Sequence, residues 1–305
     1  MLRNHCTLCS EILSPLTKAI NGCNLDIVKL LLSKGAEKKL FLPCDTKLSC
    51  EMAKFLFDNG VDINMCSYSS DYQSLQWYIS KGKLEIAKLL VESGANVNIK
   101  GKNGANLMQT LIIDLPKPVS KNYSDYQKIE NRRKEYFELI KVILKNGYDV
   151  NQKNVLLDVI DGALLSKEIY PNTTASKTIY TIDSVRTEIF RLFISYGANV
   201  NVQNSSGETP LIRAIEKNNF ELAKELISKG ALIDAKDIRG ETTLIKSSCL
   251  CQTNFVQFLI DNKADLNVVN TYGETALQKA YDKYKDNNSS DCLQTVKILK
   301  DAGAR

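Results

Sequence analysis

Few side chains in this sequence have the chemistry that a metal site requires. The one histidine, His5, stands beside Cys6 and Cys9 in an H-C-x-x-C motif, and Cys23 could supply a fourth ligand to zinc. Structural zinc sites usually combine two paired clusters, whereas this motif is a single one. We therefore expect no metal ion and interpret these cysteines as thiols.

The cysteines do not form the pattern of a disulfide framework either. There are nine of them, an odd number, and their spacing is irregular. We expect most of them to be small buried apolar groups in a reducing compartment.

Sets of residues that could form a catalytic site are also scarce. A Cys/His or Ser/His/Asp arrangement would have to use His5, and the chain has no glycine-rich phosphate loop, no H-E-x-x-H motif and no EF-hand spacing. Catalysis by carboxylates alone stays open, but most acidic residues fall at solvated positions. The sequence predicts a protein that is not an enzyme and that carries no cofactor.

The charge distribution gives little support to nucleic-acid binding. Lys and Arg number 40 against 35 Asp and Glu, a net charge of +5 spread along the chain. The basic run QKIENRRK at 127–134, with Tyr123, Tyr126 and Tyr136 nearby, could contact phosphates and stack on bases. Acidic residues interrupt that run, so weak nucleic-acid binding is kept only as an alternative.

Three glycines mark a repeat in the C-terminal half of the chain. Gly207, Gly240 and Gly273 recur at equal intervals of about 33 residues, a period typical of a repeat architecture. They open the phrases GETPL, GETTL and GETAL. In the first phrase, Thr209 can cap a helix and Pro210 can occupy the first helical position, where a missing N–H costs nothing. A short helix is therefore predicted after each glycine.

Phrases that would end a second helix recur in the same register. They are SKGAEKK, DNGVDIN, ESGANVN, KNGYDVN, SYGANVN, SKGALID, DNKADLN and DAGAR. The glycine just past such a helix end can adopt the positive φ that other residues avoid. Lys263 replaces it in DNKADLN, so that helix end should be strained or reshaped.

Together these residues resemble the ankyrin repeat family, whose pattern is Gly, Thr-Pro-Leu-His, a second helix and Gly-Ala-Asp-Val-Asn. The resemblance covers nearly the whole chain and implies an all-α ankyrin-repeat solenoid: about eight helix-turn-helix repeats with short β-hairpin-like loops, in one domain. The approximate repeats are 10–40, 41–66, 67–100, 101–153, 154–203, 204–236, 237–269 and 270–305. The family histidine is absent, and its places hold Thr17, Ile212, Ile245 and Gln278, so the hydrogen bonds that it makes between repeats must be missing or replaced.

Three repeats contain inserts, which we place between their first and second helices. The inserts lie near 116–133, 168–183 and 284–291. Those of repeats four and five should lie side by side, because equivalent points of stacked repeats emerge on one edge. Repeat two is short instead and should have a stunted first helix.

The resemblance implies a scaffold or adaptor that binds a partner protein through a concave surface of hairpins and first helices. Arg239 and Tyr272 are of the types that most often anchor interfaces. Carried over position by position, the contact residues are Lys102, Asn103, Ala105, Ser205, Ser206, Glu208, Glu216, Lys217, Ile238, Arg239, Glu241, Thr271, Tyr272, Glu274, Asp282 and Lys283.

The expected cellular location follows from the signals that we do not find in the sequence. We find no secretory signal and no membrane span, so we expect a cytoplasmic protein that is monomeric by itself and does not contact membranes. The Lys and Asn bias favours an AT-rich genome, and we consider a host-directed effector of an intracellular microbe or virus. The alternative function is an enzyme or modifier whose site is built by the inserts of repeats four and five.

Overall fold

The protein is described by a computed structural model that covers residues 14–36, 41–42, 48–66, 69–100, 104–113, 115, 123–152, 155–162 and 187–305. The chain divides into two compact units, Met1–Asp149 and Val150–Arg305. The residues His5, Cys6, Cys9, Lys102 and Asn103 lie outside the described residues, as does the whole predicted insert near 168–183.

The first unit combines helices with one small sheet. Its helices are α1 (Pro15–Asn21), α2 (Leu25–Ser33), α3 (Cys50–Asp58), α4 (Ser74–Ser80), α5 (Leu84–Glu92), α6 (Leu107–Ile113) and α7 (Tyr123–Lys145). The sheet has the order β1 (Phe41–Leu42), β2 (Asp62–Cys66) and β3 (Ser69–Gln73), with β1 parallel and β3 antiparallel to β2. Residues 37–40 and 43–47, between α2 and α3, lie outside the described residues, so the stunted first helix of repeat two stays a prediction.

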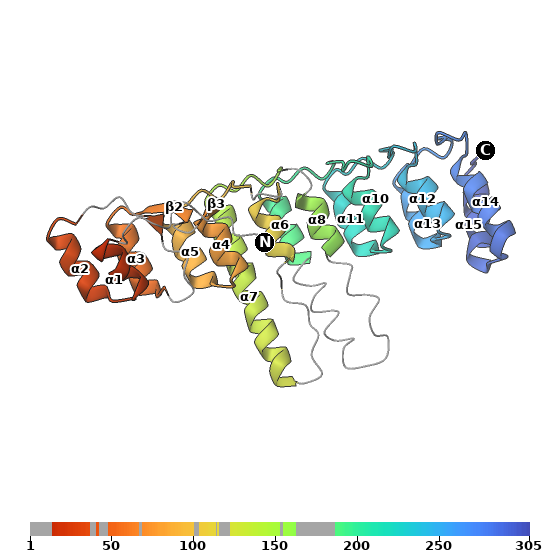
Figure 1. Cartoon of the computed structure of the whole chain (residues 1–305). Helices are drawn as coiled ribbons and strands as arrows, with labels where there is room; N and C mark the ends of the chain where they lie inside the picture. The colour runs from red at the N-terminus through yellow and green to blue at the C-terminus, as the bar shows by residue number, and fades with distance from the viewer. Residues whose placement is uncertain are drawn as a thin grey trace, which may run out of the picture. The chain divides into compact units, whose positions relative to one another are not determined.

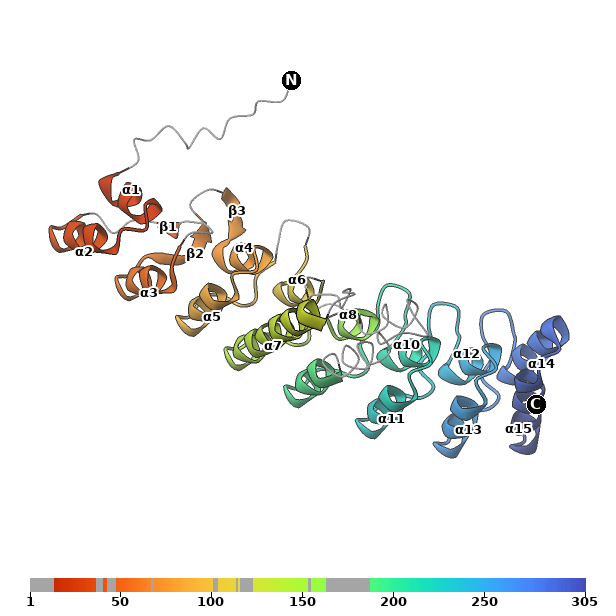
Figure 2. The same ribbon diagram turned by 90° about the horizontal axis from the view of Figure 1, so that it is seen from below.

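The second unit is a series of helix pairs. Its helices are α8 (Val155–Gly162), a helix over residues 187–195, α10 (Pro210–Glu216), α11 (Phe220–Ser228), α12 (Thr243–Cys249), α13 (Thr253–Asp261), α14 (Ala276–Asn287) and α15 (Ser290–Asp301). Figure 2 shows that α10, α12 and α14 form one row of this unit and α11, α13 and α15 another. The connections that lead into α10, α12 and α14 lie along one edge of the unit (Figure 1).

The first helices begin as the sequence predicts. The hydroxyl of Thr209 accepts a hydrogen bond from the backbone N–H of Ile212, and Pro210 occupies the first turn of α10. Thr242 and Thr275 cap α12 and α14 in the same way. Each cap satisfies a backbone N–H group that would otherwise have no partner within the helix.

The core of the second unit is made by one apolar face of each helix. Leu211 and Ile215 of α10 and Leu226 of α11 are fully buried. Leu211 and Ile215 are four residues apart, a spacing that places both side chains on one side of the helix. This burial holds the two rows of helices together.

Lys263 adopts the left-handed conformation that glycine has in the equivalent loop. Its φ is +66°, and the φ of Gly230, at the same position of the preceding repeat, is +86°. We expected this helix end to be either reshaped or strained, and its backbone is not reshaped. Strain follows from the contact of the Lys263 Cβ atom with the backbone at positive φ.

Substituting Lys263→Gly is expected to raise the free energy of unfolding by about 0.5–1 kcal/mol, because glycine avoids this contact. Urea denaturation checks the value. Lys229→Gly is the matched control, since Lys229 has a φ of −96° and gains nothing from glycine. Equal effects of the two substitutions would contradict the strain at Lys263.

In this chain, which lacks the family histidine, asparagine side chains form hydrogen bonds between consecutive loops. In the second unit, the side-chain amide of Asn201 donates to Gly230 O at 3.1 Å, and its oxygen accepts from Leu232 N at 2.8 Å. In the first unit, Asn98 forms the same pair of bonds with Gly147 O and Asp149 N. Hydrogen bonds between neighbouring repeats are thus supplied by residues at the ends of the Asn-Val-Asn phrases.

Asn201→Ala is expected to lower the free energy of unfolding by about 1–2 kcal/mol, since two hydrogen bonds of roughly 1 kcal/mol each are lost. Asn254→Ala is a suitable control, because Asn254 is exposed on α13, and a surface change of this kind costs within about 0.5 kcal/mol. Both are measured by urea denaturation. A cost for Asn201→Ala no larger than that of the control would show that the loop bonds contribute nothing.

The inserts near 116–133 and 284–291 contribute helix rather than loops alone. Helix α7 begins at Tyr123 and continues to Lys145, so much of the first insert belongs to a 23-residue helix. In the other insert, α14 continues to Asn287 and α15 begins at Ser290. The spatial proximity of the inserts of repeats four and five stays a prediction, as do the repeat boundaries and the single domain.

Candidate protein-binding face

The connections before α10, α12 and α14 have the same turn, built by one polar side chain. The side-chain oxygen of Asp237 accepts hydrogen bonds from the backbone N–H groups of Arg239 and Glu241, both at 2.9 Å. Asn204 and Asn270, at the same position of the preceding and the following repeat, form the equivalent bonds. These residues give the three turns, which we call tips, a common backbone shape.

Adjacent tips are also bonded to each other. Ile238 N donates to Ser206 O at 3.0 Å, and Thr271 N donates to Arg239 O at 2.9 Å. Gly207 allows this approach, because a Cβ atom at its position would lie 2.9 Å from Ile238 N and 3.0 Å from Asp237 Cα. The tips therefore form a fixed series in the second unit.

Large side chains project from these tips into solvent. Ile238 and Tyr272 are 69% and 73% exposed, and the Arg239 side chain is 58% exposed. Ser205 and Thr271 are exposed beside them, and Ser206 is half-buried. We call Ile238, Arg239 and Tyr272 the tip row.

A second row, of ion pairs, lies on the first helices behind the tips. Arg213, Lys246 and Lys279 recur once per repeat and occupy equivalent helical positions. Lys246 is 6% exposed, and its ammonium group lies 2.9 Å from Glu216, 3.0 Å from Asp237 and 3.3 Å from Glu241. One buried cation thus joins carboxylates from two consecutive repeats.

The other two cations form similar pairs. The guanidinium of Arg213 lies 2.7 Å from Asp161 of α8, 3.1 Å from Glu216 and 3.6 Å from Glu208. The Lys279 ammonium lies 2.9 Å from Glu274. We call Arg213, Lys246, Lys279 and their carboxylates the ion-pair row.

The ion-pair row shifts the pKa values of its members. Burial by itself lowers the pKa of Lys246, but hydrogen bonds to Glu216 and Asp237 outweigh it and raise the pKa to about 12. Burial likewise opposes the shift of Asp237, whose pKa is lowered by hydrogen bonds from Glu241 N and Lys246. The pKa of Arg213 is raised, first by its bond to Asp161, and that of Glu274 is lowered, first by its bond from Asn270. All these groups are charged at neutral pH, so the row acts as an electrostatic link between repeats.

Most of the predicted contact residues fall into two groups. Ser205, Ser206, Ile238, Arg239, Thr271 and Tyr272 lie at the tips, whereas Glu208, Glu216, Glu241 and Glu274 belong to the ion-pair row. Ala105 is half-buried beside Gly104 in the first unit, Lys217 follows the end of α10, and Asp282 and Lys283 lie on α14. The carboxylate of Asp282 accepts from the side chain of Gln278.

Five residues of the ion-pair row were missed by sequence reasoning: Asp161, Arg213, Asp237, Lys246 and Lys279. The regular spacing of the three basic residues was visible in the sequence. Lys246 was missed because a lysine is expected at the surface unless its partners are known. Those partners come from two segments, the end of α10 and the tip that precedes α12.

The expectations about metals and membranes are tested only within the described residues. Among these, no group of three or more His, Cys, Asp or Glu could hold a metal ion. No helix in the described ranges has the length and hydropathy needed to cross a membrane. Tyr136, expected beside the basic run, is 3% exposed and is therefore not available to stack on a base.

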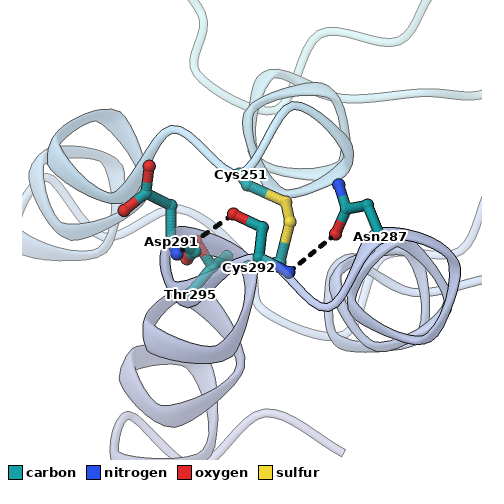
Figure 3. The surroundings of a disulfide bond; sticks show 6 residues. Cys251, Asn287, Asp291, Cys292 and Thr295 are labelled. Carbon is teal, nitrogen blue, oxygen red and sulfur yellow. Dashed lines mark hydrogen bonds between the residues drawn. A yellow bond between two sulfur atoms is a disulfide. The ribbon is translucent and has the colours of Figure 1, made fainter.

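Cys251 and Cys292 are exceptions to the expectation that most cysteines are small buried thiols. They form a disulfide that joins the turn between α12 and α13 to the start of α15 (Figure 3). Cys50 and Cys249 are free thiols, the first exposed and the second half-buried.

Comparison with protein families places these features in a known context. The family model described as ankyrin repeats in three copies matches residues 131–237, and the model of a single ankyrin repeat matches residues 74–102. Together these matches include parts of both units.

The relatives found by sequence have been given ankyrin repeat names. One from Rickettsia bellii (strain RML369-C) is 32% identical over 147 residues, which are 45% of this chain and 18% of that protein. A protein of Acanthamoeba polyphaga mimivirus is 24% identical over 61% of this chain and 51% of its own length. One from Rickettsia felis is 26% identical over 62% of this chain and 71% of its own length. The chain thus spans about half or less of the first two relatives.

Solved structures show the same fold. The ankyrin repeat domain of Bcl-3, described as a member of the IkappaB protein family, matches with a TM-score of 0.56 and 17% identity, covering 94% of this chain and 98% of that domain. An ankyrin repeat domain from Acinetobacter baumannii matches with a TM-score of 0.54 and 18% identity over 76% of this chain and 98% of that domain. Repeated tips, capped first helices, family models and named relatives agree: the chain contains ankyrin repeats and has the ankyrin repeat fold.

Proposed function

We propose that this chain is a scaffold that binds a partner protein through the tip row and the adjacent surface of the first helices. One observation carries the proposal: Ile238, Arg239 and Tyr272 are exposed on tips whose backbones are already fixed by hydrogen bonds. Isoleucine and tyrosine bury large areas on association, and arginine adds directional hydrogen bonds. A fixed backbone reduces the entropy that is lost on binding.

The ion-pair row supports this function without being its centre. Its carboxylates are committed to Arg213, Lys246 and Lys279, so a partner would have to displace these internal contacts before pairing with them. We therefore assign to Glu208, Glu216, Glu241 and Glu274 the role of holding the tips in place. Binding energy is expected to come from the tip row.

The proposal is tested by capture of the partner with the full chain as bait. Lysate of the source organism, and of its host where it has one, is passed over wild-type protein and over Tyr272→Ala and Arg239→Ala variants. A loss of about 2 kcal/mol at such an anchor corresponds to roughly 30-fold weaker binding, which titration of the captured partner measures. Leu250→Ala is the matched control, since Leu250 is 50% exposed but lies at the end of α12, away from the tips. A partner bound equally by all four proteins would show that another face is used.

We also propose that the protein works in a cytosol, and in that of a host cell if its source is an intracellular microbe or a virus. The support is the origin of the relatives, which are found in Rickettsia and in a mimivirus. Fractionation of infected host cells followed by immunodetection tests it. Recovery exclusively within the microbe or particle would exclude the host-directed role.

A further inference from the structure

Helices α14 and α15 are longer than their counterparts in the preceding repeat. Both have 12 residues, whereas α12 has 7 and α13 has 9. The predicted insert near 284–291 thus extends this helix pair. Cys292 lies in the first turn of α15, within the extension.

Cys251 lies opposite this extension, in the turn between α12 and α13. Its φ of +54° is the same as that of Asn218, which holds the same position one repeat earlier, in the turn between α10 and α11. The bond from Cys251 to Cys292 therefore connects the turn of one repeat with the added helical turn of the next (Figure 3).

The two sulfur atoms differ in their surroundings. Cys292 is 1% exposed, whereas Cys251 is half-buried in a surface turn. A reagent from solvent therefore meets Cys251 first.

We propose that Cys251 and Cys292 form a reversible redox lock, which fastens the extended α14–α15 pair to the preceding repeat. In the oxidising direction, the Cys251 thiolate attacks a low-molecular-weight disulfide RSSR, which releases one RS⁻ and leaves a mixed disulfide on Cys251. The Cys292 thiolate then attacks the Cys251 sulfur and releases the second RS⁻. Two protein thiols are oxidised and one RSSR is reduced to two thiols; excess RSH drives the reverse reaction.

The disulfide constrains the extended part of α14 and α15, whereas the tip of the same repeat does not depend on it. The Thr271 tip is held independently by its bond to Arg239 O, and Asn270 and Glu274 shape its turn. Reduction is therefore expected to loosen α15 and the end of α14 while Tyr272 keeps its position. This prediction does not rest on the proposed binding function.

The test is hydrogen exchange of the full chain, measured by mass spectrometry in buffers of oxidised and reduced glutathione. Backbone amides of α15 should exchange about tenfold faster in the reduced buffer, because they open locally once the lock is broken. Amides of α10 and α11 should keep their rates. Alkylation before digestion reports the state of each cysteine in the same samples.

Variants separate the lock from the helices that carry it. In the double variant Cys251→Asn and Cys292→Val, exchange should no longer depend on glutathione; asparagine fits the left-handed turn, as Asn218 shows, and valine fills a buried site. Cys249→Ser should respond as the wild type does. Three results would overturn the proposal: thiols at Cys251 and Cys292 in the oxidised buffer, a disulfide that persists in a large excess of reduced glutathione, or α15 exchange that is equal in both states.

Discussion

Replacing Lys246 by methionine is expected to lower the free energy of unfolding by about 3–5 kcal/mol, the usual cost of removing one partner from a buried ion pair. The side chain is 6% exposed, and its loss leaves Glu216, Asp237 and Glu241 without their shared cation. Methionine retains most of the apolar contacts of the lysine stem. The cost therefore reports uncompensated carboxylate charge rather than a cavity.

Urea denaturation at neutral pH measures the effect, and Lys224→Met is the matched control. Lys224 forms an ion pair with Glu221, but the two side chains are 45% and 81% exposed, and such a pair contributes about 0–1 kcal/mol. If both substitutions cost the same small amount, the ion-pair row does not link the repeats.

The pH dependence of the Lys246→Met effect follows from the shifted pKa values. Because the pKa of Asp237 is lowered on folding, its stabilising contribution is present above the ordinary value of about 3.9 and is lost as the pH falls through the folded value. Because the pKa of Lys246 is raised to about 12, its contribution is present below the ordinary value and is lost as the pH rises toward 12. The difference between wild type and variant should thus be greatest near neutral pH and should shrink at both extremes. A difference that is constant with pH would mean that charge is not its cause.

Gly207→Ala is expected to destabilise the second unit by about 2–4 kcal/mol, since left-handed strain of roughly 1 kcal/mol adds to the overpacking of a close backbone contact. The φ of Gly207 is +72°, and the new Cβ would lie within 3.1 Å of three backbone atoms of the next tip. Backbone atoms cannot move aside as a flexible side chain can. The bond between Ser206 O and Ile238 N should lengthen or break as the tips separate.

Gly273→Ala supplies the control, because its φ is +78° but nothing lies within 4 Å of the added Cβ. It should cost only the strain, about 1 kcal/mol. The difference between the two variants, measured by thermal or urea denaturation, isolates the contact between tips. Equal costs would show that this contact is relaxed in solution.

The repeat itself was predictable because its signals are local. A threonine cap, a proline in the first turn and a glycine of positive φ each act within a few residues, as Thr209, Pro210 and Gly230 illustrate. The exposed tips followed from the same pattern. These features form before any distant contact is known, so sequence alone indicates them.

What could not be predicted depends on the stacking of repeats. Lys246 is buried because carboxylates at 216, 237 and 241 converge on it only after α10 and α12 pack together. Cys251 and Cys292, 41 residues apart, meet because the last helix pair is extended. The antiparallel pair of β2 and β3 lies between repeats two and three, where short β-hairpin-like loops are expected, but the parallel pairing of β1 with β2 joins segments about 20 residues apart and has no local signal.

The uniform backbone of the tips, together with their different side chains, has a consequence for the alignment of a partner. A partner that shifted along the unit by one repeat would find the same turn geometry, but it would exchange Ile238 and Arg239 for Ser205 and Ser206, or for Thr271 and Tyr272. Only one alignment therefore matches its side chains. Because these residues are solvent-exposed or nearly so, substitutions among them can change which alignment is preferred while leaving the core intact.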